Sequence, residues 1–328
     1  MFENKTVLIT GGTGSLGRAL TKKLLEFPVK AIRIFSRDEW KQYEMKSEFT
    51  DKRLRFLIGD IRDKERLSRS LEDVNIVIHA AALKQVPIIE YNPIEAVKTN
   101  VYGAQNLIEC CLDKNIETVL AVSTDKAVSP LNTYGATKHL MERLFVSANN
   151  FKGNKITKFL CVRYGNVLGS RGSILPVILD QINQKKKITI TNPKMTRFNI
   201  TMDEALELIF RALKSGSGGE IFVPKLKSYQ VDILKNTILE LLNKKIDTKI
   251  IGIRPGEKFH ETLINEDEIR NSYETKNDYV IFDQITTLPK KSSSKLKKSQ
   301  LIDKYSSDKV DLLTSVELKQ ILKSNNLI

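Results

Sequence analysis

Short apolar runs alternate with amphipathic stretches along the first half of the chain. The first run, residues 5–10, carries apolar side chains at consecutive positions, as is typical of a parallel strand that is covered on both faces. Comparable runs follow at 31–35, 54–58, 75–79 and 118–122, and stretches with helical spacing lie around 63–72 and 92–113. This order predicts an α/β fold with a Rossmann-type doubly wound parallel sheet.

A glycine-rich turn follows the first strand directly. Its sequence is Gly11-Gly-Thr-Gly14-Ser-Leu-Gly17, and a helix is expected from there to about Phe27. Such glycines let the backbone turn tightly and approach a pyrophosphate, which then lies against the free amides of the helix N-terminus. The turn predicts a dinucleotide site, and a glycine-rich loop without a ligand is the alternative.

The second strand ends in Ser36 and Arg37, where NAD-binding folds usually present a carboxylate to the adenosine ribose. Arg37 can hold a 2′-phosphate through charge-assisted hydrogen bonds, and Ser36 can donate another. The pair therefore favours NADP. Because Asp38 and Glu39 follow at once, a carboxylate on the ribose hydroxyl stays open, as does a plain exposed arginine.

Loops at the carboxyl ends of the later strands should complete the site, because doubly wound sheets bind ligands there. Asp60 and Ile61 are expected near adenine, and the three alanines at 80–82 allow close backbone approach. Lys84 and residues 123–126 also lie just beyond strand ends. His79 is expected to pack in the core and not to bind a ligand.

The most informative local pattern is Tyr134-Gly-Ala-Thr-Lys138. If Tyr134 opens a helix, Lys138 lies one turn later on the same face. Its ammonium would favour the phenolate of a tyrosine whose ordinary pKa is about 10, and a phenolate can take a proton from a sugar hydroxyl. Most such pairs are surface neighbours, so the pattern gains its weight from the dinucleotide turn.

Composition excludes several other classes. The longest apolar runs are strand-sized, no signal-peptide pattern is present, and Cys110, Cys111 and Cys161 show neither metal spacing nor a disulfide framework. We expect a reduced, cytoplasmic protein without a membrane span or a metal. The net charge of +14 reflects diffuse lysines without a nucleic-acid motif, so we expect attraction for an anionic nucleotide and no binding of DNA or RNA.

Three arginine-containing loops mark the second half, at 163–173, 195–198 and 254–258. Arginine offers a planar fork for phosphate oxygens, Glu257 can accept hydrogen bonds from ribose hydroxyls, and Asn166 can bind an amide or a phosphate. Each loop alone could be a solvated turn. Together with a dinucleotide fold they predict a cleft for a nucleotide diphosphate.

The 328 residues suffice for one nucleotide-binding domain and a smaller C-terminal substrate-binding domain. We expect residues 1–165 to form the NADP-binding domain, with the chain returning to it around 199–225, and 166–285 to form most of the substrate-binding region. Residues 286–328 form a lysine-rich tail, in which 290–298 predicts a flexible linker and Thr314-Ser-Val-Glu317 predicts a capping box that opens a last helix.

These motifs resemble the extended short-chain dehydrogenases/reductases, and within them the UDP-N-acetylglucosamine 4,6-dehydratases that invert C5. The resemblance rests on residues 10–17, 36–39, 79–87, 123–138, 145–153, 163–173, 195–198, 219–225 and 254–261, and it fades after about 266. Leu16 and Asn199 stand where the resemblance leads us to expect aromatic residues. It implies a homo-oligomer, dimeric or higher, and a role in pseudaminic acid or related surface-sugar synthesis.

The motifs and the resemblance together assign ligand contacts to individual residues. The expected NADP contacts are Gly11, Thr13, Gly14, Ser15, Leu16, Gly17, Ser36, Arg37, Asp38, Glu39, Lys41, Asp60, Ile61, Ala80, Ala81, Lys84, Tyr134, Lys138 and Val167. The expected UDP-N-acetylglucosamine contacts are Lys84, Thr99, Asn166, Arg171, Thr191, Arg254 and Glu257. The expected catalytic residues are Thr124, Asp125, Lys126, Tyr134 and Lys138.

The resemblance implies a specific use for Asp125 and Lys126, since retaining dehydratases carry Asp-Glu at these positions. Oxidation at C4 makes the C5 proton acidic; a neutral Lys126 would remove it while a protonated Asp125 assists loss of the C6 hydroxyl as water. Hydride return to C6 and reprotonation on the opposite face would give UDP-2-acetamido-2,6-dideoxy-β-L-arabino-hex-4-ulose. Adjacent opposite charges favour the ionised forms instead, so burial or a shared proton must overcome them.

Two alternatives stay open. An NADP-dependent sugar-nucleotide epimerase shares the fold, Tyr134 and Lys138, but its product has the mass of its substrate. A non-catalytic NADP-binding sensor can dispense with both side chains, so the presence of Tyr134 and Lys138 argues against it.

Overall fold

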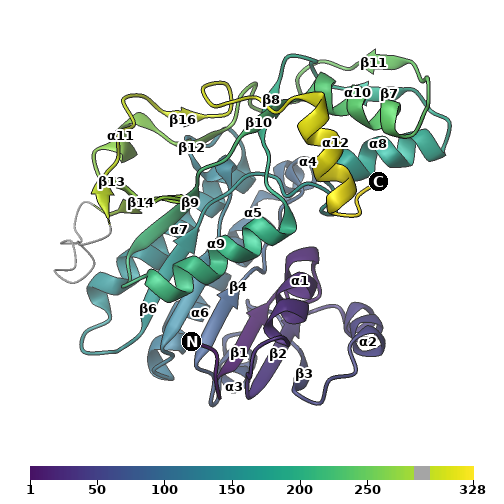
Figure 1. Ribbon diagram of the computed structural model, residues 1–328. Coiled ribbons are helices and arrows are strands. Elements are labelled where there is room, and N and C mark those ends of the chain that lie inside the picture. Colours follow the sequence, from purple (N-terminus) through teal and green to yellow (C-terminus); the bar gives the residue numbers. More distant parts are fainter. Residues whose placement is uncertain (284–295) are drawn as a thin grey trace.

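A large sheet forms the centre of the structure, a computed structural model that describes residues 1–283 and 296–328. Its strands are β1 (Thr6–Thr10), β2 (Ala31–Ser36), β3 (Leu54–Ile58), β4 (Ile76–His79), β5 (Thr118–Val122), β6 (Lys158–Val162), β9 (Glu220–Pro224), β13 (Ser272–Glu274), β14 (Asp278–Phe282) and β15 (Lys297–Lys298). They lie in the order β15-β13-β14-β9-β6-β5-β4-β1-β2-β3 (Figure 1). From β3 to β9 all neighbours pair in parallel, which confirms the predicted α/β class.

Helices cover both faces of this sheet (Figure 1). They are α1 (Ser15–Leu24), α2 (Glu39–Glu48), α3 (Lys64–Ser70), α6 (Gly103–Asp113), α7 (Thr133–Phe151) and α9 (Met202–Ser215). On one face α3, α6 and α7 share a core cluster through Leu67, Leu107 and Phe145. On the other, α1 and α9 contribute Leu20 and Ile209 to a second cluster. The apolar strands need this double cover, which explains why their sequence lacks polar alternation.

The helix predicted over 92–113 is interrupted. It consists of α5 (Pro93–Ala96), a π-helical segment η1 (Val97–Tyr102) and α6, and a short α4 (Val86–Tyr91) precedes it. Wider π turns are rare and often mark functional sites. Here the segment carries Thr99, which is buried at the edge of the main cleft.

A smaller layer lies above the carboxyl ends of the strands (Figure 1). Its elements are α8 (Ile174–Asn183), β7 (Ile188–Ile190), α10 (Val231–Leu241), β11 (Thr248–Ile250) and α12 (Ser315–Ser324). Leu318 and Leu322 of α12 are fully buried in the same cluster as Leu234 of α10. The predicted capping box is confirmed, because the side chains of Thr314 and Glu317 each accept a hydrogen bond from the other's backbone N–H.

The C-terminal tail contributes to both layers, because β15 lies at one edge of the central sheet and α12 packs in the smaller layer. The linker predicted over 290–298 lies mostly outside the described residues, but Lys297 and Lys298 form β15, so the prediction is wrong there because both pair with β13. Two small antiparallel pairs follow, made by β8 (Thr196–Phe198) with β10 (Ser228–Gln230) and by β12 (Thr262–Ile264) with β16 (Tyr305–Ser306).

In the described part of the chain, no helix has the length and apolar character needed to span a bilayer.

Candidate active site

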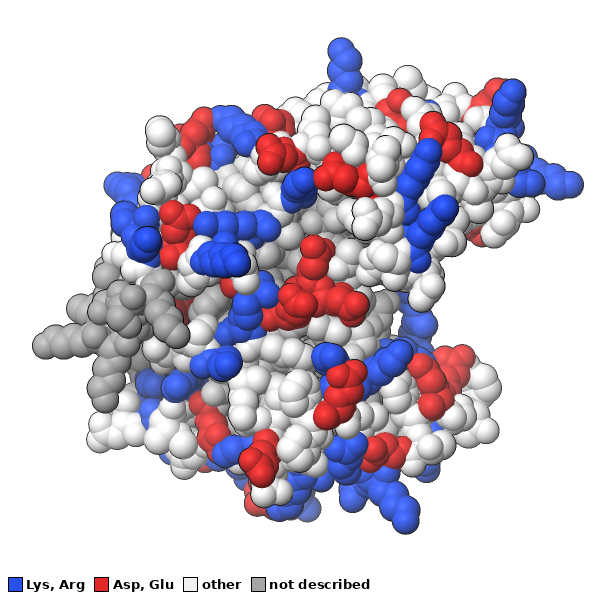
Figure 2. Space-filling view, in the orientation of Figure 1, with Lys and Arg blue, Asp and Glu red and all other residues white. Residues whose placement is uncertain are grey.

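A cleft of about 970 Å³ runs between the carboxyl ends of the parallel strands and the smaller layer. Figure 2 shows the molecule hollowed between its two parts, with acidic and basic side chains interspersed around the hollow. Most predicted contact residues line the cleft. They are Gly11, Thr13, Gly14, Ser15, Leu16, Gly17, Ser36, Arg37, Asp38, Lys41, Asp60, Ile61, Ala80, Ala81, Lys84, Thr99, Thr124, Lys126, Tyr134, Lys138, Asn166, Val167, Arg171, Arg254 and Glu257.

Three predicted site residues do not line it. Glu39 is exposed as the first residue of α2 and does not line the cleft. Thr191 places its hydroxyl 3.0 Å from Met195 Sδ in the smaller layer, so the structure does not support it as a sugar contact. Asp125 is buried and does not line the cleft itself, but it accepts hydrogen bonds from the lining residues Thr124 and Lys126.

The glycine turn fits a dinucleotide. Gly11 has φ +68°, and a Cβ there would lie 2.8 Å from the backbone of Ala81. A Cβ on Gly17 would lie 2.3 Å from the carbonyl oxygen of Gly12, so α1 can pack this close to the turn only without a side chain. Gly14 caps α1 without a side-chain hydrogen bond, which leaves the helix amides for an anion.

The carboxylate of Asp38, just after β2, serves as a helix cap. Asp38 caps α2 by accepting from the backbone N–H of Lys41 at 3.0 Å, and its other oxygen lies 2.6 Å from Lys41 Nζ. Arg37 is half-exposed at the rim, 3.5 Å from Asp60. The Ser36 hydroxyl accepts from Thr13 Oγ1 at 3.3 Å. At this end of the cleft the Arg37 side chain is therefore more exposed than the carboxylate of Asp60 that pairs with it.

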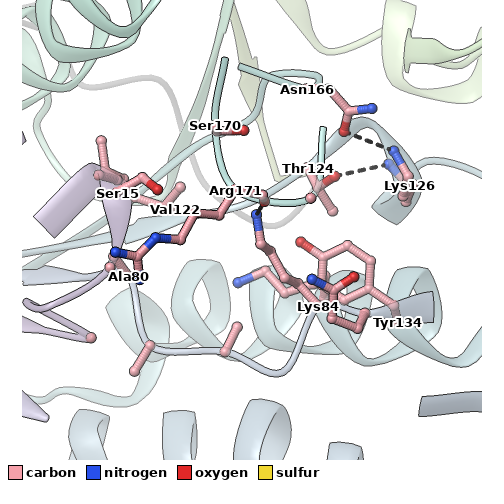
Figure 3. Close-up of a pocket in the computed structure, with 18 of the residues that line it drawn as sticks. Ser15, Ala80, Lys84, Val122, Thr124, Lys126, Tyr134, Asn166, Ser170 and Arg171 are labelled. Carbon is pink, nitrogen blue, oxygen red and sulfur yellow. Dashed lines mark hydrogen bonds between the residues drawn. The ribbon is translucent and has the colours of Figure 1, made fainter. Parts of the chain in front are cut away.

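Tyr134 and Lys138 lie one turn apart at the start of α7, as predicted. Asn132 caps this helix by accepting from Gly135 N at 2.8 Å, so Tyr134 falls in the first turn and faces Thr124 and Lys84 across the cleft (Figure 3). Burial raises the pKa of Tyr134 to about 12, although Lys126 and the Thr124 hydroxyl oppose this shift. Burial also lowers the pKa of Lys138 to about 8.

The sequence predicts that the Lys138 ammonium favours the Tyr134 phenolate, and this stays a prediction. Lys126 is a second cation, and its charge lowers the pKa of the Tyr134 phenol. Burial lowers the pKa of Lys138, although the charges of Cys161 and Glu142 oppose this shift. Three groups, Thr124, Lys126 and Tyr134, thus form one electrostatic unit.

Lys126 is the centre of that unit. It lies in the turn η2 (Asp125–Ala127), and its Nζ is 3.4 Å from Asn166 Oδ1 (Figure 3). Two carboxylates also lie near Nζ, with Asp125 Oδ1 at 3.1 Å and Glu261 Oε1 at 3.7 Å. Burial lowers the pKa of Lys126, but the two carboxylates outweigh it and hold the pKa above its ordinary value. The resting side chain is an ammonium.

Sequence reasoning missed several cleft residues. Glu261 lines the cleft 3.8 Å from Arg197, and no local spacing singled it out. Arg197, the arginine of the predicted loop 195–198, also lines the cleft and donates to Glu257 Oε1 at 3.0 Å. Tyr164 and Lys258 also line the cleft without having been assigned a role.

Arg163 is a further correction, because its loop was grouped with phosphate-binding loops. Its side chain is fully buried and binds Glu142 Oε2 at 2.7 Å, Glu268 Oε1 at 2.8 Å and the Leu263 carbonyl at 2.9 Å. It joins α7 to β12 and to α11 (Glu266–Ile269) and contributes nothing to the cleft lining. His79, predicted to be a core residue, is confirmed as one: it is fully buried and pairs with Thr10 Oγ1 at 2.8 Å.

The chain is similar in sequence to sugar-nucleotide enzymes. The UDP-N-acetylglucosamine 4,6-dehydratase (inverting) of Campylobacter jejuni serotype O:23/36 is 48% identical, over 89% of this chain and 87% of that protein. The UDP-glucose 4-epimerase of Rickettsia rickettsii is 38% identical over 98% of this chain and 96% of that protein. The resemblance to the inverting dehydratases is therefore confirmed, while the epimerase-named relatives match more of the chain at lower identity.

Solved structures agree with the fold. The X-ray structure of Pen from Bacillus thuringiensis superposes with a TM-score of 0.93 at 37% identity and covers all of both chains. More distant structures, at 22% identity, are sugar-nucleotide dehydratases and epimerases with NAD bound, and they share the Rossmann-type architecture. The sequence model of one family matches residues 7–283, and the chain accordingly belongs to the polysaccharide biosynthesis protein family.

Proposed function

We propose that this protein is a UDP-N-acetylglucosamine 4,6-dehydratase that inverts C5 and recycles NADP within each turnover. The observation that carries the proposal is Lys126, held between Asp125 and Glu261 and facing the same cleft as Tyr134. A C4 oxidation alone needs only the tyrosine. A buried amine between two carboxylates supplies the acid and base that an elimination across C5 and C6 requires in addition.

NADP is the cofactor that the adenosine end supports. Asp38 is engaged as a helix cap, and Arg37 and Ser36 remain to hold a 2′-phosphate. Bound nicotinamide supplies hydride acceptance from C4 and hydride return to C6. The chain itself orients the dinucleotide through the glycine turn and the amides at the start of α1.

Tyr134 removes the C4 hydroxyl proton. Its pKa of about 12 means that this step needs help, which the positive charge of Lys126 and the hydroxyl of Thr124 provide. Once C4 is a carbonyl, Lys126 takes the C5 proton and Asp125 assists departure of the C6 hydroxyl as water. Asp125 accepts from Thr124 Oγ1 at 2.8 Å and from Lys126 Nζ, so the proton it needs must come through this network.

The diphosphate end is lined by cations from three segments. Lys84 donates to the carbonyl of Arg171, which links the loop after β4 to the loop after β6, and Arg254 lies across the cleft. Arg197 donates to Glu257 Oε1 at 3.0 Å and the backbone N–H of Arg254 donates to Oε2 at 3.5 Å, and a carboxylate oxygen can accept a further hydrogen bond from a ribose hydroxyl. These side chains suit a UDP moiety.

We also propose a homo-oligomer. Large apolar side chains are exposed on neighbouring turns of α4, α5 and η1, namely Ile88, Tyr91, Ile94 and Tyr102. Exposed apolar side chains close together in the sequence are consistent with a subunit contact. The product would enter the synthesis of pseudaminic acid or a related surface sugar.

A sugar-nucleotide 4-epimerase is the second candidate, favoured by the epimerase-named relatives that match 98% of the chain. A 4-epimerase neither removes a C5 proton nor expels water, so the buried cluster around Lys126 would have no task in it. The two candidates differ in product mass.

The decisive experiment is to incubate the purified protein with UDP-N-acetylglucosamine in D₂O and to record mass and proton spectra. We expect a product lighter by one water, with deuterium at C5 and an inverted C5 configuration. A product of unchanged mass would establish the epimerase, and deuterium at C5 with retained configuration would refute inversion. UDP-glucose in a parallel reaction tests the preference for the acetamido sugar.

A further inference from the structure

Glu261 occupies an unusual position beneath the cleft. It immediately precedes β12, its side chain is 3% exposed, and Oε1 lies 3.7 Å from Lys126 Nζ and 3.8 Å from Arg197 Nε. Its Oε2 is buried and has no hydrogen-bond partner in the described part of the chain. A buried carboxylate oxygen without a donor is costly in the ionised form.

The other carboxylate of the cluster is better satisfied. Asp125 accepts hydrogen bonds from Thr124 Oγ1 at 2.8 Å and from Lys126 Nζ at 3.1 Å, both of which stabilise its anion. Among the described residues, Glu261 Oε2 has no hydrogen-bond donor, and Oε1 has only the longer ion pairs with Lys126 and Arg197. Of the two carboxylates that face Lys126, Glu261 is therefore the one that gains more from a proton.

The charges around Glu261 come from three elements. Lys126 and Asp125 face it from η2, Arg197 from β8, and Lys258 from its own loop. Burial raises the pKa of Glu261 and Asp125 adds to this, whereas Lys126, Arg197 and Lys258 oppose it. The site is thus poised between the two protonation states of the carboxyl group.

We infer that Glu261 takes the ammonium proton from Lys126 and so creates the neutral amine that removes the C5 proton; this rests on the proposed function. One Nζ–H bond breaks and one O–H bond forms on Glu261, and no other group is oxidised or reduced. The proton later returns or exchanges with solvent. The 3.7 Å separation must shorten by about 1 Å, as catalytic contacts commonly do when substrate binds.

The transfer keeps the net charge of the cluster, although it works against the two carboxylates that hold the pKa of Lys126 above its ordinary value. Before it, Asp125 and Glu261 are negative and Lys126 and Arg197 are positive; afterwards Asp125 and Arg197 remain as one negative and one positive group. No charge enters or leaves a buried site, so the penalty for an unpaired buried ion does not arise. Without Glu261, Lys126 would have to release its proton to solvent.

The test is the pH dependence of turnover in Glu261→Gln, which keeps the shape and removes the proton acceptor. In the wild type we expect kcat to change little through the neutral range, because the proton stays inside the cluster. In Glu261→Gln we expect kcat at neutral pH to fall on the order of 100-fold and to recover as pH rises, because solvent then deprotonates Lys126. Deuterium incorporation at C5 should follow kcat, and calorimetric binding of UDP should stay unchanged.

Glu220→Gln provides the matched control. Glu220 is another buried glutamate, but it lies on β9, accepts from the amides of Ser217 and Gly218, and does not line the cleft. We expect a wild-type pH profile from it. Circular dichroism checks that both variants are folded.

Several outcomes would overturn the inference. A Glu261→Gln enzyme that is equally impaired at every pH would show a merely structural role, and one with wild-type kcat would show no role. If that variant does not fold, the wild type alone still decides, because a wild-type kcat that climbs with pH through the neutral range contradicts internal transfer. A wild type that forms no dehydrated product overturns the proposed function itself, which separates the two failures.

Discussion

The cofactor side and the reacting side of the cleft are built in different ways. On the cofactor side, contacts come from contiguous motifs such as the turn from Gly11 to Gly17, each directly after its own strand. On the reacting side, Glu261 lies within 4 Å of both Lys126 and Arg197. Ser307 in the tail hydrogen-bonds Thr196, which is 111 positions away in the sequence. Cofactor binding therefore depends on local geometry, whereas the elimination chemistry depends on long-range packing.

The largest effect should come from removing the central amine. Lys126→Ala should lower dehydration by about 100-fold to 10,000-fold, because it removes the group proposed to take the C5 proton, while NADP binding persists through the untouched glycine turn. Turnover in D₂O measures the loss of dehydration, and an NADP titration measures whether cofactor binding persists. Inverted, labelled product at a near wild-type rate would remove Lys126 from its role and make Tyr134 the favoured base.

Breaking the buried arginine cluster should separate fold stability from chemistry. Arg163→Met leaves Glu142 buried without its cation, so we expect the free energy of unfolding to fall by about 3–5 kcal/mol in urea titration. Lys187→Met is the control, because Lys187 and Asp247 are both largely exposed and their pairing adds little. If the two variants unfolded at the same urea concentration, the structural role given to Arg163 would be contradicted.

The cofactor side is tested by Arg37→Asp. Losing the phosphate partner and adding a carboxylate near Asp60 should weaken NADP binding by about 2–5 kcal/mol, and NAD binding much less. Calorimetric titration of both cofactors measures the difference. Equal weakening would mean that Arg37 does not recognise the 2′-phosphate.

The smallest expected effect concerns the tail. Ser307 Oγ accepts from Glu261 N at 2.9 Å and contacts Thr196 Oγ1 at 2.6 Å, so Ser307→Ala leaves buried donors unpaired and should cost about 1–3 kcal/mol of stability. We expect kcat to fall with NADP affinity unchanged, because the disturbance reaches only the reacting side. Ser299→Ala, elsewhere in the tail, is the control, and a loss of NADP affinity in Ser307→Ala would contradict the division between the two sides.

Sequence alone determined the parts whose physics is local. Apolar runs predict the strands, glycines predict the turn, Tyr134 and Lys138 follow from one helical turn, and Thr314 with Glu317 predicts the start of α12. In each case the residues that interact are within a few positions of one another. Their spacing in the chain is therefore sufficient to predict that they contact one another.

Tertiary structure decided which charges face which. Only folding withdraws Arg163 into a buried cluster and occupies Asp38 as a helix cap. It also brings Glu261 beside Lys126, with a serine from the tail holding the backbone of Glu261. The physical reason is that an ionisable group takes its role from partners and burial, and for these groups the deciding environment comes from segments that spacing along the chain does not relate.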